Sequence, residues 1–267
     1  FDHLFDAVVV TDAEGIINDW NIGSELLYGW TKEEAIGQPV HILHVSEDVD
    51  CIMLEVILSV EKFGKWNGEI RYLHKDGHVG WLESMCVPIF DDNNQMIGAL
   101  GINRDITTRV EETKQLQYQA YYDALTKLPN RTLFFDRLEK TLALSKRKKH
   151  AFALLFIDLD NFKSINDKYG HAIGDQVLVE VSKKIQNCIR ESDTVARISG
   201  DEFVILLTEI ASNDEPGTMG KRIIDILTKP IQVKGHVVCH IGASIGISLY
   251  PEHSSNLDEL LVLADKA

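Results

Sequence analysis

The longest apolar run in the chain ends directly in acidic residues, and this feature restricts how the surrounding segment can fold. Ala151–Ile157 contains only hydrophobic residues, and Asp158 and Asp160 follow it at once. A bounded apolar run of this length predicts a buried strand and is far too short to span a bilayer. Two carboxylates crowded at the end of such a strand are unfavourable unless a cation or hydrogen bonds compensate their charge.

A second pair of carboxylates follows in a predicted hairpin. Asp201 and Glu202 lie between the predicted strands 194–198 and 203–207, which four residues separate. Acidic residues at a strand end and at a neighbouring hairpin tip can converge on one hard cation such as Mg²⁺. Either cluster alone is typical of a solvated turn. The two together, flanking a segment that contains Lys, Asn, His and Asp, favour a magnesium site.

Strands and helices alternate in the rest of the second half. Apolar periodicity predicts helices over 162–169, about 175–190 and about 221–227, and strands over 237–240 and 243–248. Such alternation indicates an α/β layer architecture.

The first half instead predicts an antiparallel sheet. Segments typical of strands are found at 7–11, 16–20, 66–74, 78–90 and 96–105. Thr31-Lys-Glu-Glu34 matches a capping box and predicts a short helix after the second strand. Short helices between a strand pair and a strand trio imply a sheet that helices cover on one face. The fold class predicted for the whole chain is therefore mixed α+β and α/β.

Charge and cysteine usage exclude several classes of protein. The net charge is −14, and residues 1–110 carry 19 acidic against 7 basic residues, which argues against binding of nucleic acid by the first half. The 4 cysteines are far apart, so neither a disulfide scaffold nor a structural zinc knuckle is expected, and a reducing cytoplasm suits the chain. The sequence begins at Phe1 without a signal-peptide pattern, which predicts a piece of a longer protein, attached to a membrane elsewhere if at all.

Short motifs of the first half occur in the order and spacing of a PAS domain. They are 21–37, Trp66-Asn-Gly-Glu69, Lys75-Asp-Gly77 and Arg104-Asp-Ile-Thr107. On these motifs, residues 1–107 resemble a PAS domain. The resemblance implies a five-stranded antiparallel sheet with short helices and a sensory role, but these residues do not specify the ligand or signal.

Residues 108–122 contain neither Gly nor Pro and predict a helical linker. Near-heptad spacing relates Ile106, Val110, Thr113, Gln117 and Ala120. A coiled coil would use these positions as its seam. Because three of them are not strongly apolar, a plain connecting helix is the alternative.

Motifs of the second half match another family in order and spacing. They include Asp123-Ala-Leu-Thr-Lys-Leu-Pro-Asn-Arg131, Asp158-Leu-Asp-Asn-Phe-Lys163, Gly170-His-Ala-Ile-Gly-Asp175 and Ala196-Arg-Ile-Ser-Gly-Asp-Glu-Phe203. On them, residues 123–267 resemble the GGDEF domain of diguanylate cyclases, which implies a nucleotidyl-cyclase-like fold. Ser199 replaces the first glycine of the name motif, giving an SGDEF variant. Serine restricts the backbone there, so reduced or unchanged activity is expected. The C-terminal helix of the family, with its phosphate-binding lysine and arginine, is expected to be missing, because the sequence stops before it.

The resemblance implies a catalytic centre at the two acidic clusters. Asp158, Asp201 and the backbone carbonyl of Leu159 correspond to magnesium ligands, and Glu202 corresponds to a residue beside the metal or on a second ion. Lys163 corresponds to a lysine that contacts the triphosphate. Asp201 also holds the family's proton-acceptor position, although activation of the 3′-hydroxyl by the metal is an equal alternative.

The following segment would hold the guanine base of GTP. Asn166, His171 and Asp175 correspond to the family's guanine-binding positions. Guanine presents N1–H and N2–H₂ as adjacent donors, and a carboxylate such as Asp175 accepts both, whereas adenine would leave it unpaired. GTP is therefore expected over ATP. For His171, a structural role at a junction between helix and loop is the alternative.

Arg190 and Asp193 resemble the family's RxxD site, where the product cyclic di-GMP binds and inhibits. Arginine pairs bidentately with phosphate or guanine edges, and aspartate pairs with guanine donors. The alternative is an arginine stabilised by a helix C-terminus, with Asp193 as a cap or turn residue.

Taken together, the motifs predict a PAS-regulated diguanylate cyclase. It would condense two GTP molecules into cyclic di-GMP and two pyrophosphates with one or two Mg²⁺ ions. A homodimer is expected, because one site cannot align two nucleotides. One alternative is a regulatory domain that binds GTP or cyclic di-GMP with little catalysis and controls a downstream EAL phosphodiesterase domain. Another is a dimerising sensor whose output is the first domain and its helix.

Overall fold

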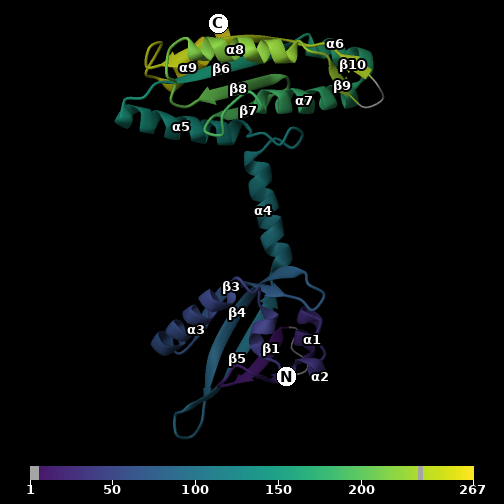
Figure 1. Ribbon diagram of the computed structural model, residues 1–267, viewed down its shortest axis with the longest axis vertical. Helices are drawn as coiled ribbons and strands as arrows, with labels where there is room; N and C mark the ends of the chain where they lie inside the picture. Colours follow the sequence, from purple (N-terminus) through teal and green to yellow (C-terminus); the bar gives the residue numbers. More distant parts are fainter. Residues whose placement is uncertain (1–5, 234–236) are drawn as a thin grey trace. The chain divides into compact units, whose positions relative to one another are not determined.

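A computed structural model of the chain describes residues 6–233 and 237–267. The chain forms two units that divide between Gln115 and Leu116 (Figure 1). Within the described residues, no helix is both long and apolar enough to cross a membrane.

The first unit is built on one antiparallel sheet. Its strands are β1 (Ala7–Asp12), β2 (Ile17–Trp20), β3 (Trp66–Leu73), β4 (Val79–Phe90) and β5 (Met96–Asp105). They lie in the order β2-β1-β5-β4-β3, and each neighbouring pair runs antiparallel. This arrangement confirms the predicted five-stranded antiparallel sheet.

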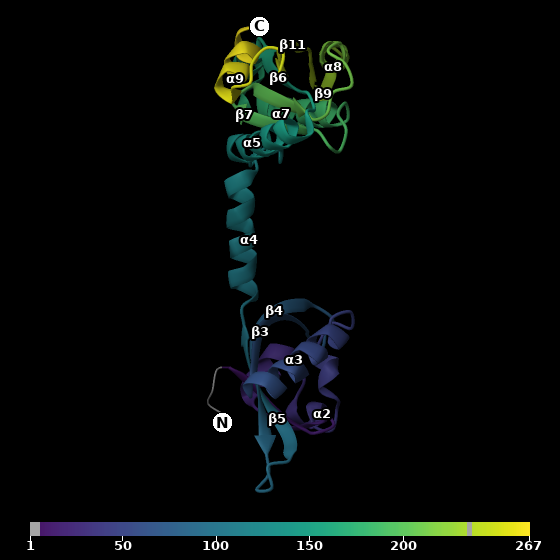
Figure 2. The ribbon, with the colours of Figure 1, turned by 90° about the vertical axis from the view of Figure 1, so that its left-hand side faces the viewer.

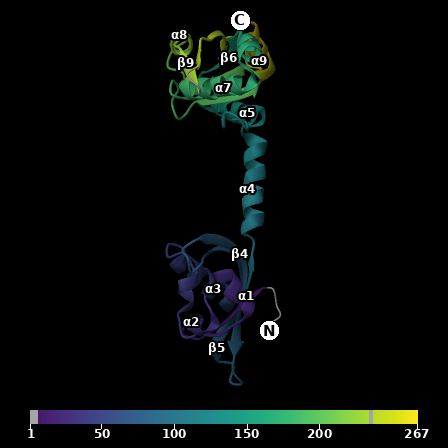
Figure 3. The same ribbon diagram turned by 90° about the vertical axis from the view of Figure 1, so that its right-hand side faces the viewer.

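Helices between β2 and β3 cover one face of this sheet (Figure 3). They are α1 (Ile22–Tyr28), α2 (Lys32–Ala35), a 3₁₀ turn (Val40–Leu43) and α3 (Val49–Phe63). The capping box predicted at Thr31 is present at the start of α2. The core between helices and sheet includes Trp20, Tyr28, Leu43 and Leu82, each at most 1% exposed. We predicted only short helices here, so the 15-residue α3 differs from the prediction.

The predicted linker helix is α4 (Thr107–Tyr121). It begins where the carboxylate of Asp105 accepts the backbone N–H of Thr107 (2.8 Å). No residue of α4 is buried. Ile106, the first position of the predicted seam, lies before α4 and packs inside the first unit, where it is 5% exposed. This part of the seam prediction is wrong, because a buried side chain is not available to a second helix.

The second unit has a four-stranded antiparallel sheet. Its strands are β6 (Phe152–Asp160), β7 (Thr194–Ser199), β8 (Glu202–Leu207) and β11 (Gly242–Tyr250), in the order β11-β6-β8-β7. A separate ribbon pairs β9 (Ile231–Val233) with β10 (Val237–Cys239). Ser199 pairs with Glu202 across the hairpin, so only Gly200 and Asp201 join β7 to β8. The predicted four-residue separation was too long, and Glu202 is a strand residue.

Helices pack on both faces of this sheet because successive side chains of β6 point to opposite faces. Leu155 and Ile157 share one core with α7 (His171–Gln186) and α8 (Glu215–Leu227). Leu154 shares the other with α5 (Arg131–Lys148) and α9 (Leu257–Lys266). Figure 2 shows α8 and α9 on opposite sides of the sheet. The predicted α/β layer architecture is confirmed.

Several helix boundaries differ from the prediction. α7 begins at His171 rather than Asp175, because Gly170, with a φ of 83°, is the single residue between it and α6 (Phe162–Tyr169). α8 begins six residues earlier than predicted, and Pro216 is tolerated in its first turn. α5 and α9 were not predicted.

Candidate functional site

The end of β6 is an acidic edge of the second sheet. Asp158 lies opposite Glu202 of β8 on one side and opposite Ser244 of β11 on the other. Asp160 accepts a hydrogen bond from the hydroxyl of Ser244 (2.8 Å). Asp201 lies in the hairpin turn and immediately precedes Glu202, the first residue of β8. The structure thus brings together the strand-end and hairpin acids that the sequence singled out.

Crowding of negative charge changes the chemistry of this edge. Burial raises the pKa of Asp158, and the charges of nearby carboxylates raise it further, namely those of Asp201, Glu202, Asp160 and Asp265. Like charges directly opposite each other on neighbouring strands destabilise a sheet. A hard divalent cation would remove this repulsion and would find the oxygen ligands that it prefers. The backbone of Leu159, whose side chain is 1% exposed, lies between two of these acids. The donor set therefore fits Mg²⁺.

Arg197 holds the tip of the β7–β8 hairpin in place. Its guanidinium donates to the backbone carbonyl of Gly200 (2.9 Å) and to the carboxylate of Asp123 (3.1 Å) in the loop before α5. Gly200 has a positive φ of 44°, whereas Ser199 does not have a positive φ. The expected backbone restriction by serine is therefore absent. Instead, the Ser199 hydroxyl donates a hydrogen bond to Glu202.

The predicted guanine-binding residues come from α6 and α7. Asn166 approaches Gly174 so closely that a Cβ at position 174 would lie 1.9 Å from its Oδ1 atom. This oxygen is buried and has no hydrogen-bond partner among the described residues. Asp175 directly follows Gly174, and this adjacency places it near Asn166. The Asp175 side chain is exposed. Lys163 and His171 are exposed in the first turns of α6 and α7. Buried acceptors are normally paired, so Asn166 can accept a further donor.

A groove of about 350 Å³ runs along α7 beside Asp175. Leu125, Val179 and Val233 supply apolar parts of its lining, and Lys183 lines it as well. The other lining residues are polar or charged, namely Asp175, Gln176, Glu180 and Gln232.

Arg190 and Asp193 lie between α7 and β7, at the opposite end of β7 from the hairpin tip. Asp193 is buried, and its carboxylate accepts the backbone N–H groups of Arg190 (3.2 Å) and Thr208 (3.1 Å). The Arg190 side chain pairs with Glu215 (2.7 Å). Asp193 therefore organises a turn, and the pair is separate from the acidic edge. A groove of about 300 Å³ beside them includes Arg137.

Family models match both units of the chain. Residues 120–267 match the family model described as diguanylate cyclase, GGDEF domain, and residues 1–106 match the PAS fold. The chain belongs to the GGDEF diguanylate cyclase family. Its GGDEF domain follows a PAS domain, as the motifs predicted.

Relatives of this GGDEF protein include the probable diguanylate cyclase DgcE of Escherichia coli, which is 32% identical over 100% of this chain. The bifunctional diguanylate cyclase/cyclic di-GMP phosphodiesterase MucR of Pseudomonas aeruginosa is 42% identical over 60% of the chain. The chain spans 24% of DgcE and 23% of MucR. A solved GGDEF domain of TpbB from P. aeruginosa has a TM-score of 0.53 at 43% identity, covering 54% of this chain and 84% of that one.

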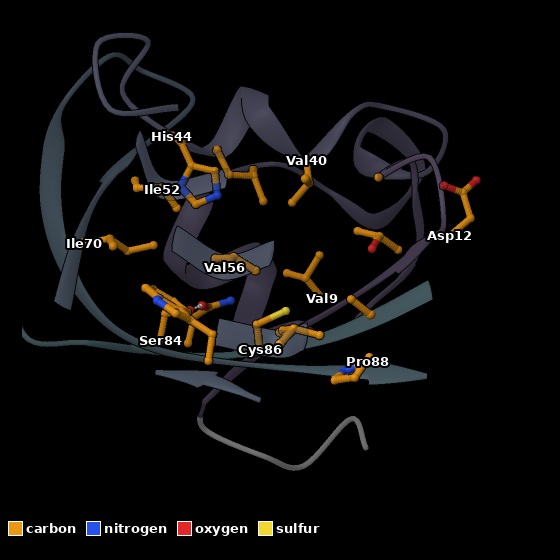
Figure 4. A pocket seen from close by; sticks show the side chains of 18 of the residues that line it. Val9, Asp12, Val40, His44, Ile52, Val56, Ile70, Ser84, Cys86 and Pro88 are labelled. Carbon is orange, nitrogen blue, oxygen red and sulfur yellow. Dashed lines mark hydrogen bonds between the residues drawn. The ribbon is translucent and has the colours of Figure 1, made fainter. Parts of the chain in front are cut away.

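The PAS domain contains a cavity of about 400 Å³ (Figure 4). Val56 of α3 and Ile70 of β3 contribute to its largely apolar wall. Ser84 donates to Asn103 (2.6 Å) at the sheet side, and the buried Nδ1 of His44 has no hydrogen-bond partner among the described residues. Burial lowers the pKa of His44, so its ring is neutral at pH 7. The lining suits an uncharged, mostly apolar small molecule.

Two residues that position the GGDEF hairpin were missed by the sequence analysis. Arg197 and Asp123 both occur in motifs that carried the resemblance, but no motif or spacing indicated that they contact each other. They are 74 residues apart, and only the folded chain brings them together. Their charge complementarity was the one signal available.

Proposed function

We propose that the GGDEF domain condenses two GTP molecules into cyclic di-GMP and two pyrophosphates, under control of the PAS domain. The observation that carries this proposal is the acidic edge, where Asp158 lies opposite Glu202 and Asp201 is close enough to raise the Asp158 pKa. Like charge makes this edge unfavourable without a cation, and GTP is used by such enzymes as its magnesium complex.

Each residue has a part in this proposal. Asp158, Asp201 and the carbonyl of Leu159 hold Mg²⁺, with Glu202 beside it. Bound Mg²⁺ neutralises phosphate charge and favours ionisation of a 3′-hydroxyl. Lys163 contacts the triphosphate and stabilises the charge that develops during transfer.

In this proposal, residues at the α6–α7 junction recognise the guanine base. The unpaired Oδ1 of Asn166 and the carboxylate of Asp175 accept the guanine N–H donors, and His171 lies beside them. Adenine would leave these acceptors unpaired, which disfavours ATP.

The reaction requires a second copy of the chain. Each 3′-oxygen forms a bond to the α-phosphorus of the other GTP, pyrophosphate leaves, and the hydroxyl proton passes to Asp201 or to solvent. Two GGDEF domains that face each other supply this alignment. The PAS domain and α4 would control whether they meet. Arg190 would bind product once it leaves Glu215, with Asp193 beside it.

The test is production of cyclic di-GMP from GTP and Mg²⁺ by the purified chain and by the longer protein that contains it. Asp201→Ala should abolish product, whereas Asp136→Ala, at an exposed position on α5, should leave it unchanged. Tight binding of GTP or cyclic di-GMP without turnover in the longer protein would reject the cyclase and support the regulatory alternative, in which this domain controls an EAL phosphodiesterase domain.

A further inference from the structure

Two histidines and an aspartate converge at the turn between β3 and β4 of the PAS domain. The Nδ1 atoms of His74 and His78 lie 2.9 Å and 2.7 Å from the same Oδ1 atom of Asp76. One ligand atom from each of the three residues lies within 4.8 Å of the others. The two imidazole rings stack, with centroids 4.3 Å apart.

The backbone and its neighbours hold this arrangement in place. The N–H of His74 donates to the carbonyl of His78 (2.9 Å), and the N–H of Gly77 donates to the carbonyl of His74 (2.9 Å). A Cβ at Gly29 would lie 2.4 Å from Nε2 of His74, so this ring packs directly on the glycine. Three potential ligands therefore lie within five residues. The Nδ1 of His74 also accepts the backbone N–H of Asp76 (3.2 Å), and the stacked rings must rotate for both imidazoles to bind one ion.

The chemistry of the three side chains selects a class of ion. Imidazole nitrogens suit first-row transition metals such as Zn²⁺, whereas Mg²⁺ prefers oxygen ligands. The Asp76 carboxylate adds an oxygen ligand beside the two nitrogens. Lys75, the cation between them in sequence, pairs with Glu34 instead (2.6 Å).

The approach to the turn is open. Asp76 and His78 have 64% and 54% of their side chains exposed, and His74 has 20%. Ligand atoms of a tetrahedral zinc ion lie ~3.3 Å apart, from bond lengths near 2.0–2.1 Å. The observed separations from Asp76 are about 0.4 and 0.6 Å shorter, and the exposed side chains of Asp76 and His78 can open by that amount.

We propose that His74, Asp76 and His78 form a binding site for a transition-metal dication of the Zn²⁺ type, with water in the remaining position. This site is separate from the acidic edge of the GGDEF domain and does not depend on cyclase activity. It also lies close to the start of the linker helix, because the Tyr72 ring meets His78 edge-on and its hydroxyl donates to Asp105 (3.3 Å).

The test is a calorimetric titration of the intact chain with ZnCl₂ in excess Mg²⁺, which occupies the acidic edge. We expect one equivalent of Zn²⁺ that His78→Gln removes or weakens by at least about tenfold, since even loss of a partner of a metal ligand costs about 10–100-fold. Asp76→Asn, which keeps an acceptor for the backbone N–H of His78 (3.0 Å), should have the same effect. His150→Gln removes an exposed histidine paired with one acid only, Glu209, and should change nothing.

Absorption of Co²⁺ added in place of Zn²⁺ gives a second measurement, because a site with nitrogen ligands has a visible spectrum that differs from that of the hydrated ion. The parent chain should give this spectrum, and the His78 variant should not. Unchanged Zn²⁺ affinity in both the His78 and Asp76 variants would overturn the proposal. So would a parent chain that binds no Zn²⁺ in excess Mg²⁺.

Discussion

Replacing Gly174 with alanine should weaken nucleotide binding while leaving the free energy of unfolding nearly unchanged. The new Cβ would lie 1.9 Å from Oδ1 and 2.9 Å from Cγ of Asn166, and 3.3 Å from the Phe162 ring. The Asn166 oxygen must therefore move by about 1.5 Å to reach an ordinary contact distance. Because the obstructing atom is the end of a side chain, the amide can rotate away. It then no longer occupies the position proposed to accept a guanine donor.

The two consequences differ in size. Alanine in a helix interior is favoured over glycine by about 0.5–1 kcal/mol, and this gain offsets part of the cost of the contact. We expect the free energy of unfolding to change by less than about 1 kcal/mol. Loss of one acceptor from a polar site costs about 1–3 kcal/mol, so GTP affinity should fall by about 5–150-fold.

The assay pairs urea unfolding with calorimetric binding of a non-hydrolysable GTP analogue. Gly217→Ala is the matched control, because this glycine of α8 has no atom within 4 Å of a Cβ. It should bind the analogue as tightly as the parent chain. Adding Gly174→Ala to Asn166→Ala should cause little further loss, since both changes remove one interaction. Parent-like affinity in the Gly174 variant, or a loss of several kcal/mol in stability, would refute this reasoning.

Three further predictions concern the hairpin and its support. Ser199→Gly should leave unfolding free energy and turnover close to those of the parent, because Ser199 has no strained φ and contributes only a hydrogen bond to Glu202; a large gain in cyclic di-GMP production would contradict this. Arg197→Lys should destabilise the chain by roughly 1–3 kcal/mol in urea, because lysine cannot reproduce two separate guanidinium bonds. Burial alone would raise the pKa of Asp123, but bonds from Thr126 and Arg197 outweigh it and lower the pKa. Its contribution to stability is therefore present above the unfolded pKa of about 3.9 and lost as the pH falls through the lower folded value. The free energy of unfolding of Asp123→Asn should therefore not show this decrease as the pH falls below about 4. A decrease equal to that of the parent chain would argue against this account.

Much of the fold could be predicted because it depends on local chemistry. The apolar run of β6, the capping box at Thr31 and the turn residues of the first sheet each specify their own element. α6 was predicted with its observed bounds. Prediction failed where two elements meet, as at Gly170, where a single residue ends one helix and begins the next.

The sequence by itself determined which chemical groups are available: acids after a buried strand, a second acidic pair in a hairpin, and polar residues between them. Tertiary structure decided which of these groups meet. A two-residue turn, rather than a four-residue one, makes Glu202 a strand residue, and the pairing of β8 with β6 places it opposite Asp158. The contact of Asn166 with Gly174 and that of Arg197 with Asp123 likewise follow from packing. Local preferences act over a few residues, whereas strand register and helix contact depend on how distant segments bury their apolar faces together.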